Sequence, residues 1–522
     1  MFNCVNGDNL PLIVMLLLAL SAFGQSTVSQ VLTSTCQTNV NNPCSGSQTV
    51  QATSATTYLN SQGILFDPSV SYYGFEKINT IILGIHHVRS GAITSTYIAN
   101  VKDMAASGIL TQYVASTDRN PAIDTTLYWS ATGQITSLFT FLTSSFGPTV
   151  QSFVDVIEAP NELDAEYNQT YWLPSDYPST TLCATNSCGK WYGQFGINYQ
   201  QSLWAILKGN SQTSTVKILG PSIATAFPSP FAVAAGGGGA DLQGYADFGG
   251  CHPYATAGNG YGVPQTTYDN TSYYLGYTLL PSSQVDFAPF AWQQCNSSTT
   301  DGAPTGTVYG TTPLAPSEQG FYTGTANNSV PEDTHAKYYP RIYAEMYRHG
   351  MPRSITFRFD DQCSDLTNPQ CNWGLMRFDK TLKPAYYAMK SLNTLLLDPG
   401  GAFSPGTLTY SVSVSANGAF TRTQYMHDLL LEKSNGEFYL LFWHEIADVK
   451  KQEDDGSQIV GTAHYLFPLS LPVTITLPNT IGHATLYTYD SNWNMQPTAL
   501  TITSHQVSLT ATDEISVLRL GT

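Results

Sequence analysis

The stretch VDVIEAPNELD, residues 154–164, places an Asn-Glu pair directly after a run of residues that suits a buried strand. Pro160 ends that strand, and Asn161 and Glu162 follow it. One interpretation is structural: Asn161 caps a helix whose first turn holds Glu162 and Asp164. The other is chemical, because α/β barrels keep their catalytic groups at the carboxyl ends of their strands. The rest of the chain decides between the two.

Strands and helices alternate on both sides of this stretch. Apolar runs predict eight strands, at residues 63–69, 85–91, 110–116, 154–160, 216–224, 246–254, 313–321 and 354–360. Helical periodicity predicts helices at residues 73–84, 95–108, 134–145, 191–208, 335–350 and 383–396. This alternation predicts an α/β fold, a (β/α)8 barrel that occupies residues 53–398.

The pattern changes after the last of these helices. Runs such as GEFYLLFWHE (436–445) and HATLYTYD (483–490) alternate with a period of two, which is typical of strands. Asn435-Gly436 stands between two such runs and predicts a β-hairpin. Residues 399–522 are therefore expected to form an all-β sandwich domain.

The amino-terminal segment has the features of an export signal. Residues 10–24 are apolar but too short to span a bilayer, and Ala22-Phe23-Gly24 resembles a cleavage site. We expect residues 1–24 to be a signal peptide and residues 25–52 to be an exposed Ser/Thr-rich leader. The mature protein is then expected to be secreted or periplasmic, with no membrane attachment, and a monomer.

Cysteine usage agrees with export. Eight cysteines remain after residue 24, an even number that favours disulfides in an oxidising compartment. The neighbouring pairs 36–44, 183–188 and 363–371 would close small loops and leave 251–295, although the sequence alone does not fix this pairing.

Composition excludes several classes of partner. The net charge is -16, with 21 Lys and Arg against 37 Asp and Glu, which argues against binding to nucleic acid or to an anionic membrane. The ten His are scattered, so we expect no catalytic metal, and no cofactor motif is present. The 32 Tyr and 8 Trp suit flat, half-polar ligands such as sugars, although ordinary core packing accounts for most of them.

Two predicted strands end near a glutamate: Glu162 after the fourth and Glu318, in PSEQGF, on the seventh. Further stretches accompany them, among them GIHHVRSG on the second strand, CHPY on the sixth, and NWGLMRFDKTLKPAYYAMKSL after the eighth. This ordered set resembles the retaining glycoside hydrolases of the (β/α)8 cellulase-like clan, clan A. Specifically, it resembles secreted members that carry a carboxyl-terminal β-sandwich.

The resemblance implies roles for individual residues. Glu162 is expected to be the acid/base and Glu318 the nucleophile, with their carboxyl groups about 5–5.5 Å apart. Asn161 is expected to hold the sugar 2-hydroxyl, and Arg89 to lie under Glu318 and favour its charged form. The remaining expected contacts are His252 in the sugar subsite, Tyr254 as a donor to Glu318, and Trp373 as a sugar platform.

Each of these residues also has a structural interpretation. Arg89 is also compatible with an ordinary ion pair inside the barrel. His252 and Tyr254 suit packed positions at the end of a strand, and Trp373 suits the core. At the end of the eighth strand, where the clan often has a Glu, this sequence has Arg358 and Asp360 instead.

The leading hypothesis is a secreted retaining β-glycoside hydrolase that acts on a polysaccharide or oligosaccharide. A β-glucan such as cellulose is the first expectation, and xylan and galactan are alternatives. A second hypothesis is a non-catalytic carbohydrate-binding or surface protein on a barrel scaffold. A third, an adhesin that uses the barrel as a spacer, is disfavoured by the intact barrel motifs.

Overall fold

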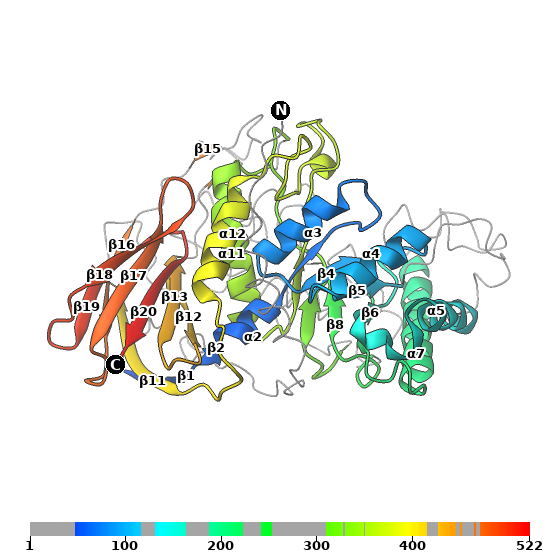
Figure 1. The fold of residues 1–522 in the computed structure, drawn as a ribbon, viewed down its shortest axis with the longest axis horizontal. Coiled ribbons are helices and arrows are strands. Elements are labelled where there is room, and N and C mark those ends of the chain that lie inside the picture. The colour runs from blue at the N-terminus through cyan, green and yellow to red at the C-terminus, as the bar shows by residue number, and fades with distance from the viewer. Residues whose placement is uncertain are drawn as a thin grey trace, which may run out of the picture.

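The computed structural model of the chain describes residues 47–115, 131–162, 187–222, 242–252, 309–326, 329–348, 350–414, 426–444, 449–450, 464–465 and 470–522. Parallel strands lie at one end of the molecule and antiparallel sheets at the other, with α11 and α12 between them (Figure 1). No helix within the described ranges is long and apolar enough to cross a membrane.

Eight strands of the described part pair only in parallel with one another: β3 (Gln62–Leu65), β4 (His87–Ser90), β5 (Leu110–Val114), β6 (Val154–Glu158), β7 (Lys217–Leu219), β8 (Gly249–Cys251), β9 (Leu314–Pro316) and β10 (Ser354–Thr356). Six pair in the order β10-β3-β4-β5-β6-β7, and β8 pairs with β9. A parallel bridge between Leu219 and Phe248 links β7 to the start of β8, and the Phe357 amide donates to the Gln319 carbonyl at 2.7 Å beyond β9 and β10. The α/β fold with parallel strands is confirmed.

Helices pack against these strands. Their bounds are α2 (Ala55–Asn60), α3 (Tyr73–Ile82), α4 (Ser95–Ala105), α5 (Ala131–Phe146), α7 (Ser187–Lys208), α11 (Glu332–Arg348) and α12 (Pro384–Leu396), with short 3-10 helices η2 (Gly147–Ser152) and η6 (Pro369–Cys371). Local sequence explains their ends. Thr94 caps α4 by accepting a hydrogen bond from the Tyr97 amide, and Pro384 begins α12 where no amide donor is needed.

The remaining strands form two larger sheets and one small one. Their bounds are β1 (Gln48–Gln51), β2 (Thr53–Ser54), β11 (Thr407–Val414), β12 (Met426–Glu432), β13 (Phe438–His444), β14 (Val449–Lys450), β15 (His464–Tyr465), β16 (Leu471–Thr476), β17 (His483–Tyr489), β18 (Met495–Leu500), β19 (Gln506–Ala511) and β20 (Ser516–Gly521). The sheet β1-β11-β16-β19 and the sheet β18-β17-β20-β13-β12-β2 share one buried apolar cluster. We call these two sheets the two-sheet unit. The hairpin predicted at Asn435-Gly436 is confirmed, since it joins antiparallel β12 and β13.

The expected leader at residues 25–52 is wrong in its last part. Gln48–Gln51 forms β1, which pairs with β11, and Thr53–Ser54 pairs in parallel with β12. The chain therefore contributes to the two-sheet unit before it enters the parallel strands, and that unit is not confined to residues 399–522. The cause is non-local, because strand partners for these residues lie far along the sequence. Residues 1–46, which include the expected signal peptide, lie outside the described ranges.

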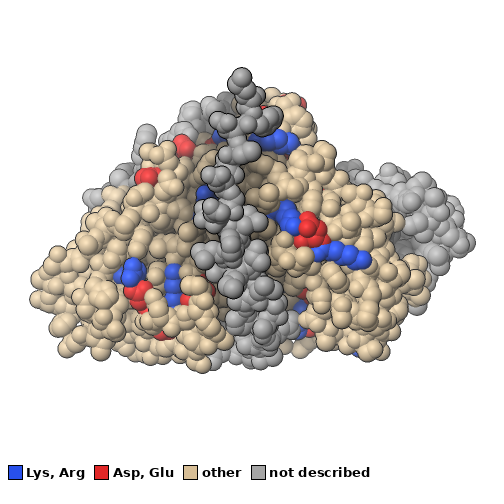
Figure 2. Space-filling view, viewed as in Figure 1, with Lys and Arg blue, Asp and Glu red and all other residues tan. Residues whose placement is uncertain are grey.

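The two-sheet unit is held against the helices by apolar and polar contacts. A buried cluster joins Tyr58 of α2, Tyr347 of α11 and Leu392 of α12 to Trp443 of β13. The Tyr489 hydroxyl donates to the Ala388 carbonyl of α12 at 3.1 Å. Charged side chains are sparse on the face drawn in Figure 2, where basic groups lie beside acidic ones. This agrees with the 11% charged residues of the chain.

Candidate active site

The segment after β6 carries the two residues with which the sequence argument began. Asn161 and Glu162 are half-buried, and the Glu162 amide donates to the Ser222 carbonyl at 3.1 Å. Glu162 has a φ of 46°, a left-handed conformation that residues other than glycine adopt rarely. A residue in the first turn of a helix does not have this backbone geometry. The helix-cap interpretation of Glu162 is therefore wrong, and the strained backbone is of the kind that clusters at functional sites.

Arg89, on β4, connects the groups at this end of the strands. Its Nε and Nη2 donate to the two oxygens of Glu158 at 2.7 and 2.8 Å. Nη2 also donates to Asn161 Oδ1 at 2.6 Å, and Nη1 donates to Glu318. One buried guanidinium thus positions Asn161 and the expected nucleophile together. Arg89 therefore does form ion pairs inside the parallel strands, with Glu158 and Glu318, and these pairs are part of the candidate site.

Glu158, the last residue of β6, is the buried anchor of this network, and sequence reasoning gave it no role. It is completely buried and also accepts hydrogen bonds from Gln112 at 2.9 Å, Ser317 at 2.9 Å and Ser222 at 3.3 Å. Burial raises the pKa of its carboxyl, but the charge and hydrogen bonds of Arg89 outweigh burial and hold that pKa below its usual range. The sequence did carry a signal for this role: Glu158 stands where the alternation of Val154 and Val156 would place a third apolar residue facing the interior.

His252 follows β8 and lies between the two expected catalytic carboxylates. Its Nδ1 is 2.7 Å from Glu162 Oε1 and 3.7 Å from Glu318 Oε2, and its Nε2 is 3.1 Å from Ser317 Oγ. Burial lowers the pKa of His252. The charge of Glu318 and the interactions with Glu158 and Glu162 outweigh burial and raise it to about 10.

Glu162 and Glu318 converge on one another. With His252 they form a cluster in which one ligand atom from each residue lies within 4.8 Å of the others. Two carboxyl groups about 5–5.5 Å apart are the arrangement that retaining glycosidases use, whereas inverting enzymes separate them by about 6.5–9.5 Å. The chemistry that this geometry supports is therefore displacement by one carboxylate with proton transfer by the other.

The same three residues have a spacing that suits a metal ion. Metal ligands must be deprotonated, whereas a raised pKa keeps His252 protonated in the neutral range. A positively charged His252 is attracted to the two carboxylates, whereas it would repel a cation. The donor set therefore fits a metal poorly.

The expected role of Trp373 as a sugar platform is wrong. A sugar platform needs an open ring face, but Trp373 is only 2% exposed. Tyr322 and Phe357 contact it edge to face, with ring centroids 5.0 and 5.8 Å away. Trp373 is therefore a buried packing residue in contact with Tyr322 and Phe357. The other expected contact, Tyr254, lies outside the described residues.

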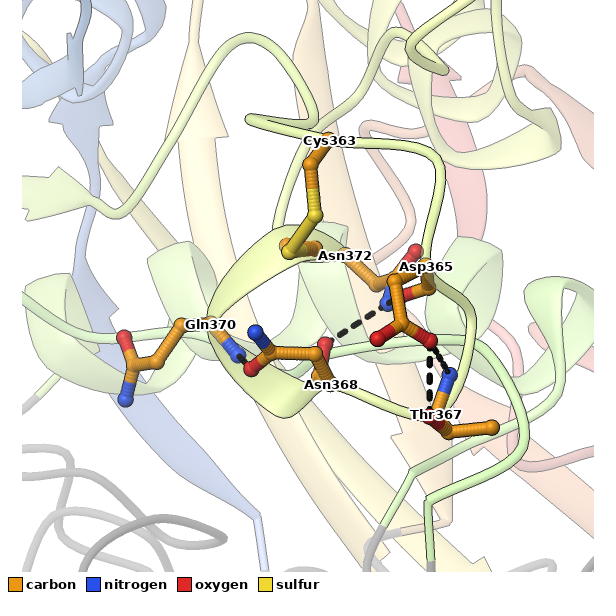
Figure 3. Close-up of a disulfide and its surroundings, with 7 residues drawn as sticks. Cys363, Asp365, Thr367, Asn368, Gln370 and Asn372 are labelled. Carbon is orange, nitrogen blue, oxygen red and sulfur yellow. Dashed lines mark hydrogen bonds between the residues drawn. A yellow bond between two sulfur atoms is a disulfide. The ribbon is translucent and has the colours of Figure 1, made fainter.

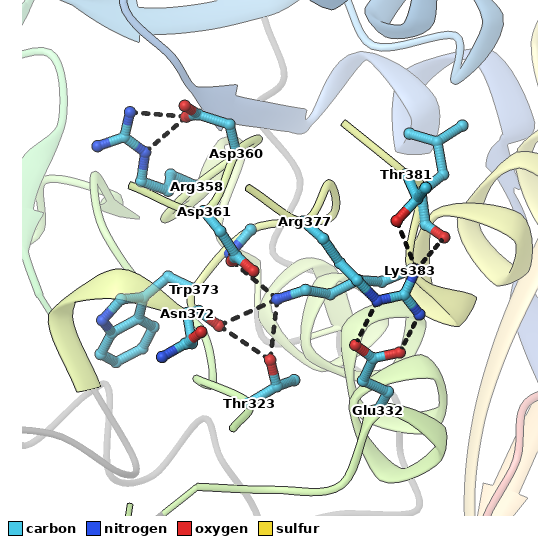
Figure 4. Close-up of polar contacts among 12 residues, drawn as sticks. Thr323, Glu332, Arg358, Asp360, Asp361, Asn372, Trp373, Arg377, Thr381 and Lys383 are labelled. Atoms are coloured by element: carbon cyan, nitrogen blue, oxygen red, sulfur yellow. Dashed lines mark hydrogen bonds and ion pairs between the residues drawn. The ribbon is translucent and has the colours of Figure 1, made fainter. Parts of the chain in front are cut away.

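A second polar network fixes the loops that follow β9 and β10 (Figure 4). Lys383, at the start of α12, donates to Asp361 Oδ1 at 2.8 Å, Thr323 Oγ1 at 2.9 Å and the Asn372 carbonyl at 3.2 Å. Arg358, which the sequence offered in place of a Glu, donates to Asp360 at 2.8 Å. Its charge is therefore already paired at the end of the eighth strand.

A disulfide closes the loop between these anchors. Cys363 and Cys371 are bonded, as predicted, and Asp365 Oδ1 accepts from the amide and hydroxyl of Thr367 within the loop (Figure 3). Cys251 is also disulfide-bonded. Cys36, Cys44, Cys183 and Cys295 lie outside the described residues, as does the side chain of Cys188, so the other pairings stay predictions.

Glu76, on α3, gives a prediction about stability. It is fully buried, and its carboxyl oxygens have no hydrogen-bond partner among the described residues. Burial, and then the charge of Asp360, raise the pKa of Glu76 to about 9. The folded chain therefore keeps a proton that the unfolded chain loses near pH 4.5, so the free energy of unfolding falls as pH rises from about 4.5 to 9. Glu76→Gln is expected to remove this loss and to be more stable at pH 8 by on the order of 2 kcal/mol.

The measurement is the Tm of both chains between pH 5 and 8.5. The gain of Glu76→Gln should grow with pH, whereas Asp333→Asn at an exposed position of α11 should show no such trend. A gain of equal size at every pH would show that folding does not raise the pKa of Glu76.

The chain is similar to a family 39 glycoside hydrolase from the gut symbiont Bacteroides cellulosilyticus WH2, with a TM-score of 0.51 and 13% identity, over 89% of this chain and 82% of that one. It is also similar to a glucosidase from Croceicoccus marinus, with a TM-score of 0.50 and 12% identity, over 93% of this chain and 98% of that one.

The chain shares the fold of these two enzymes. The likeness agrees with the fold that the motifs indicated. At identities of 12–13%, this likeness shows the fold and neither the reaction nor the substrate. No protein-family model matches the sequence, and no curated protein matches it.

Proposed function

We propose that this chain is a secreted retaining β-glycoside hydrolase, built as a (β/α)8 barrel joined to a β-sandwich. The observation that carries the proposal is the convergence of Glu162 and Glu318, on either side of His252, at the ends of β6 and β9. The likeness in fold to a glycoside hydrolase and a glucosidase supports it, and α/β barrels place their catalytic groups at the carboxyl ends of their strands.

The reaction proceeds by double displacement. Glu162 gives a proton to the leaving oxygen while Glu318 attacks the anomeric carbon and forms a glycosyl-enzyme. Glu162 then removes a proton from water, which attacks the same carbon and releases Glu318. Arg89 sets a positive charge against Glu318 and orients Asn161, the residue proposed to contact the sugar 2-hydroxyl.

The substrate class proposed first is a β-glucan, with xylan and galactan as alternatives. Arg358 is paired with Asp360, and Lys383 is paired with Asp361. Because these charges already neutralise one another, uncharged groups of a substrate suit this part of the site best. A neutral polysaccharide fits that surrounding. No resident metal or cofactor is required by the reaction.

Release of reducing sugar from a panel of β-glucan, cellulose, xylan and galactan tests the proposal. At least one substrate should be hydrolysed, and Glu318→Gln should hydrolyse none. Proton NMR of the first product should show the β-anomer before mutarotation, because two inversions restore the configuration. An initial α-anomer from a β-linked substrate would refute the retaining mechanism.

Export is part of the proposal. The apolar residues 10–24 and the disulfide between Cys363 and Cys371 support it, because disulfides persist in oxidising compartments. The mature chain collected from the medium or periplasm should begin at Gln25. Recovery of the activity only from the cytosol, with Met1 retained, would contradict export.

A further inference from the structure

Ser317 occupies a place in the site that the double-displacement scheme does not use. It directly precedes Glu318, is completely buried, and its amide donates to the Cys251 carbonyl at 3.0 Å. Its Oγ is 2.9 Å from Glu158 Oε1 and 3.1 Å from His252 Nε2. Ser317 thus links the buried anchor carboxylate to the imidazole between the catalytic glutamates.

Counting protons fixes the direction of these bonds. A serine hydroxyl has one proton to donate, and an ionised carboxylate only accepts. Arg89 keeps Glu158 ionised, so the Ser317 proton points to Glu158. The Ser317 oxygen must then accept from His252, which places a proton on Nε2 of the ring.

A proton fixed on Nε2 determines what Nδ1 does. If the ring is neutral, Nδ1 presents a lone pair to Glu162 Oε1, 2.7 Å away, and the contact is stable only when Glu162 carries a proton. If the ring is charged, Nδ1 donates to a Glu162 carboxylate. In both states the couple of Glu162 and His252 retains a proton between Oε1 and Nδ1.

We propose that Ser317 is a positioning residue that fixes the tautomer of His252 and thereby makes Glu162 and His252 titrate as one acid. The inference rests on the proposed function, because it assigns the role of general acid in that reaction to a pair of residues. The raised pKa of His252 agrees with it. The charged groups that face the ring are Glu158 of β6, Glu162 after β6 and Glu318 after β9, with Arg89 of β4 behind them.

The chain provides a matched control. Ser222 Oγ also contacts Glu158 Oε1, at 3.3 Å, but no contact joins it to His252 in the described part of the structure. Ser222→Ala removes a hydrogen bond from the same carboxylate and leaves the tautomer of His252 fixed. Ser317→Thr keeps the hydroxyl and is the conservative variant.

The first readout is the pH dependence of kcat/KM, whose alkaline limb reports loss of the proton from the couple. Ser317→Ala should move that limb to lower pH by about one unit, the effect of one hydrogen bond to a charged group. Ser317→Thr and Ser222→Ala should keep the parent limb. Equal shifts in Ser317→Ala and Ser222→Ala would overturn the proposal, because the effect would then come from Glu158 alone.

The second readout does not need activity. With ¹⁵N-labelled histidine, the His252 signals are assigned by their absence in His252→Gln, and Nε2 should remain protonated across the neutral range. An Nε2 without a proton, or a ring that titrates near the ordinary pKa of about 6.5, would overturn the proposal even if Ser317→Ala failed to fold. A parent chain that hydrolyses no glycoside refutes the proposed function, while the same titration of the parent and of Ser317→Ala still decides whether Ser317 controls the tautomer.

Discussion

Replacing Glu318 with alanine is expected to lower kcat by about 10⁴-fold or more on every substrate, including aryl glycosides with good leaving groups. No covalent glycosyl-enzyme forms without the attacking carboxylate, so the leaving group offers no escape from the defect. Arg89 also loses its contact with Glu318 in this variant. Rates of release of an aryl leaving group, measured at saturating substrate, check the prediction.

Azide distinguishes this variant from a misfolded chain. The space left by the Glu318 side chain lies on the side of the sugar that the nucleophile attacks, so azide should restore turnover and give the inverted glycosyl azide. Glu437→Ala, a change within the two-sheet unit, serves as the control and should keep parent activity without azide. Activity of Glu318→Ala close to that of the parent would place the chemistry elsewhere.

Replacing Glu162 with alanine is expected to give a different phenotype. On natural substrates the loss should be about 10²–10⁴-fold, the usual contribution of general acid-base catalysis. On aryl glycosides with good leaving groups the first step should be nearly unaffected, because departure needs little proton assistance. The second step still lacks its base, so the glycosyl-enzyme should accumulate and appear as a burst of the aryl product.

The product of azide rescue identifies the role of Glu162. Azide attacks the accumulated glycosyl-enzyme, so Glu162→Ala should give a glycosyl azide of retained configuration. If the two variants exchanged their azide products, the assignments of acid/base and nucleophile would be reversed. Intact-mass measurement after rapid quenching should show one glycosyl group bound to Glu162→Ala and none bound to Glu318→Ala.

Local sequence predicted those parts of the fold that depend on local signals. The alternation of strands and helices gave the parallel strands, and Asn435-Gly436 gave the hairpin between β12 and β13, because turn chemistry acts over a few residues. β1 was missed for the opposite reason. Its four residues have no strong pattern and become a strand only when β11 supplies the partner.

The same distinction applies to the site. Glu162 and Glu318 were recognised because each stands in a short motif near a strand end. Glu158 and Ser317 were missed, since their roles depend on which strands face one another across the interior. Trp373 was misjudged because exposure of a ring is decided by neighbours such as Phe357, and spacing along the chain carries no record of that contact.

The pairing of β1 with β11 affects how the chain folds during synthesis and where it can be truncated. Thr49 and Thr409, whose hydroxyls lie 2.7 Å apart, are separated by 360 residues. During synthesis β1 emerges early and must wait until most of the chain has followed before its edge is covered. Contacts of such long range slow folding, and an uncovered strand edge invites association with other chains. For the same reason a truncation between the parallel strands and the carboxyl-terminal strands does not separate two complete units. A truncation at residue 398 would remove β11, the partner of β1, and leave β1 unpaired.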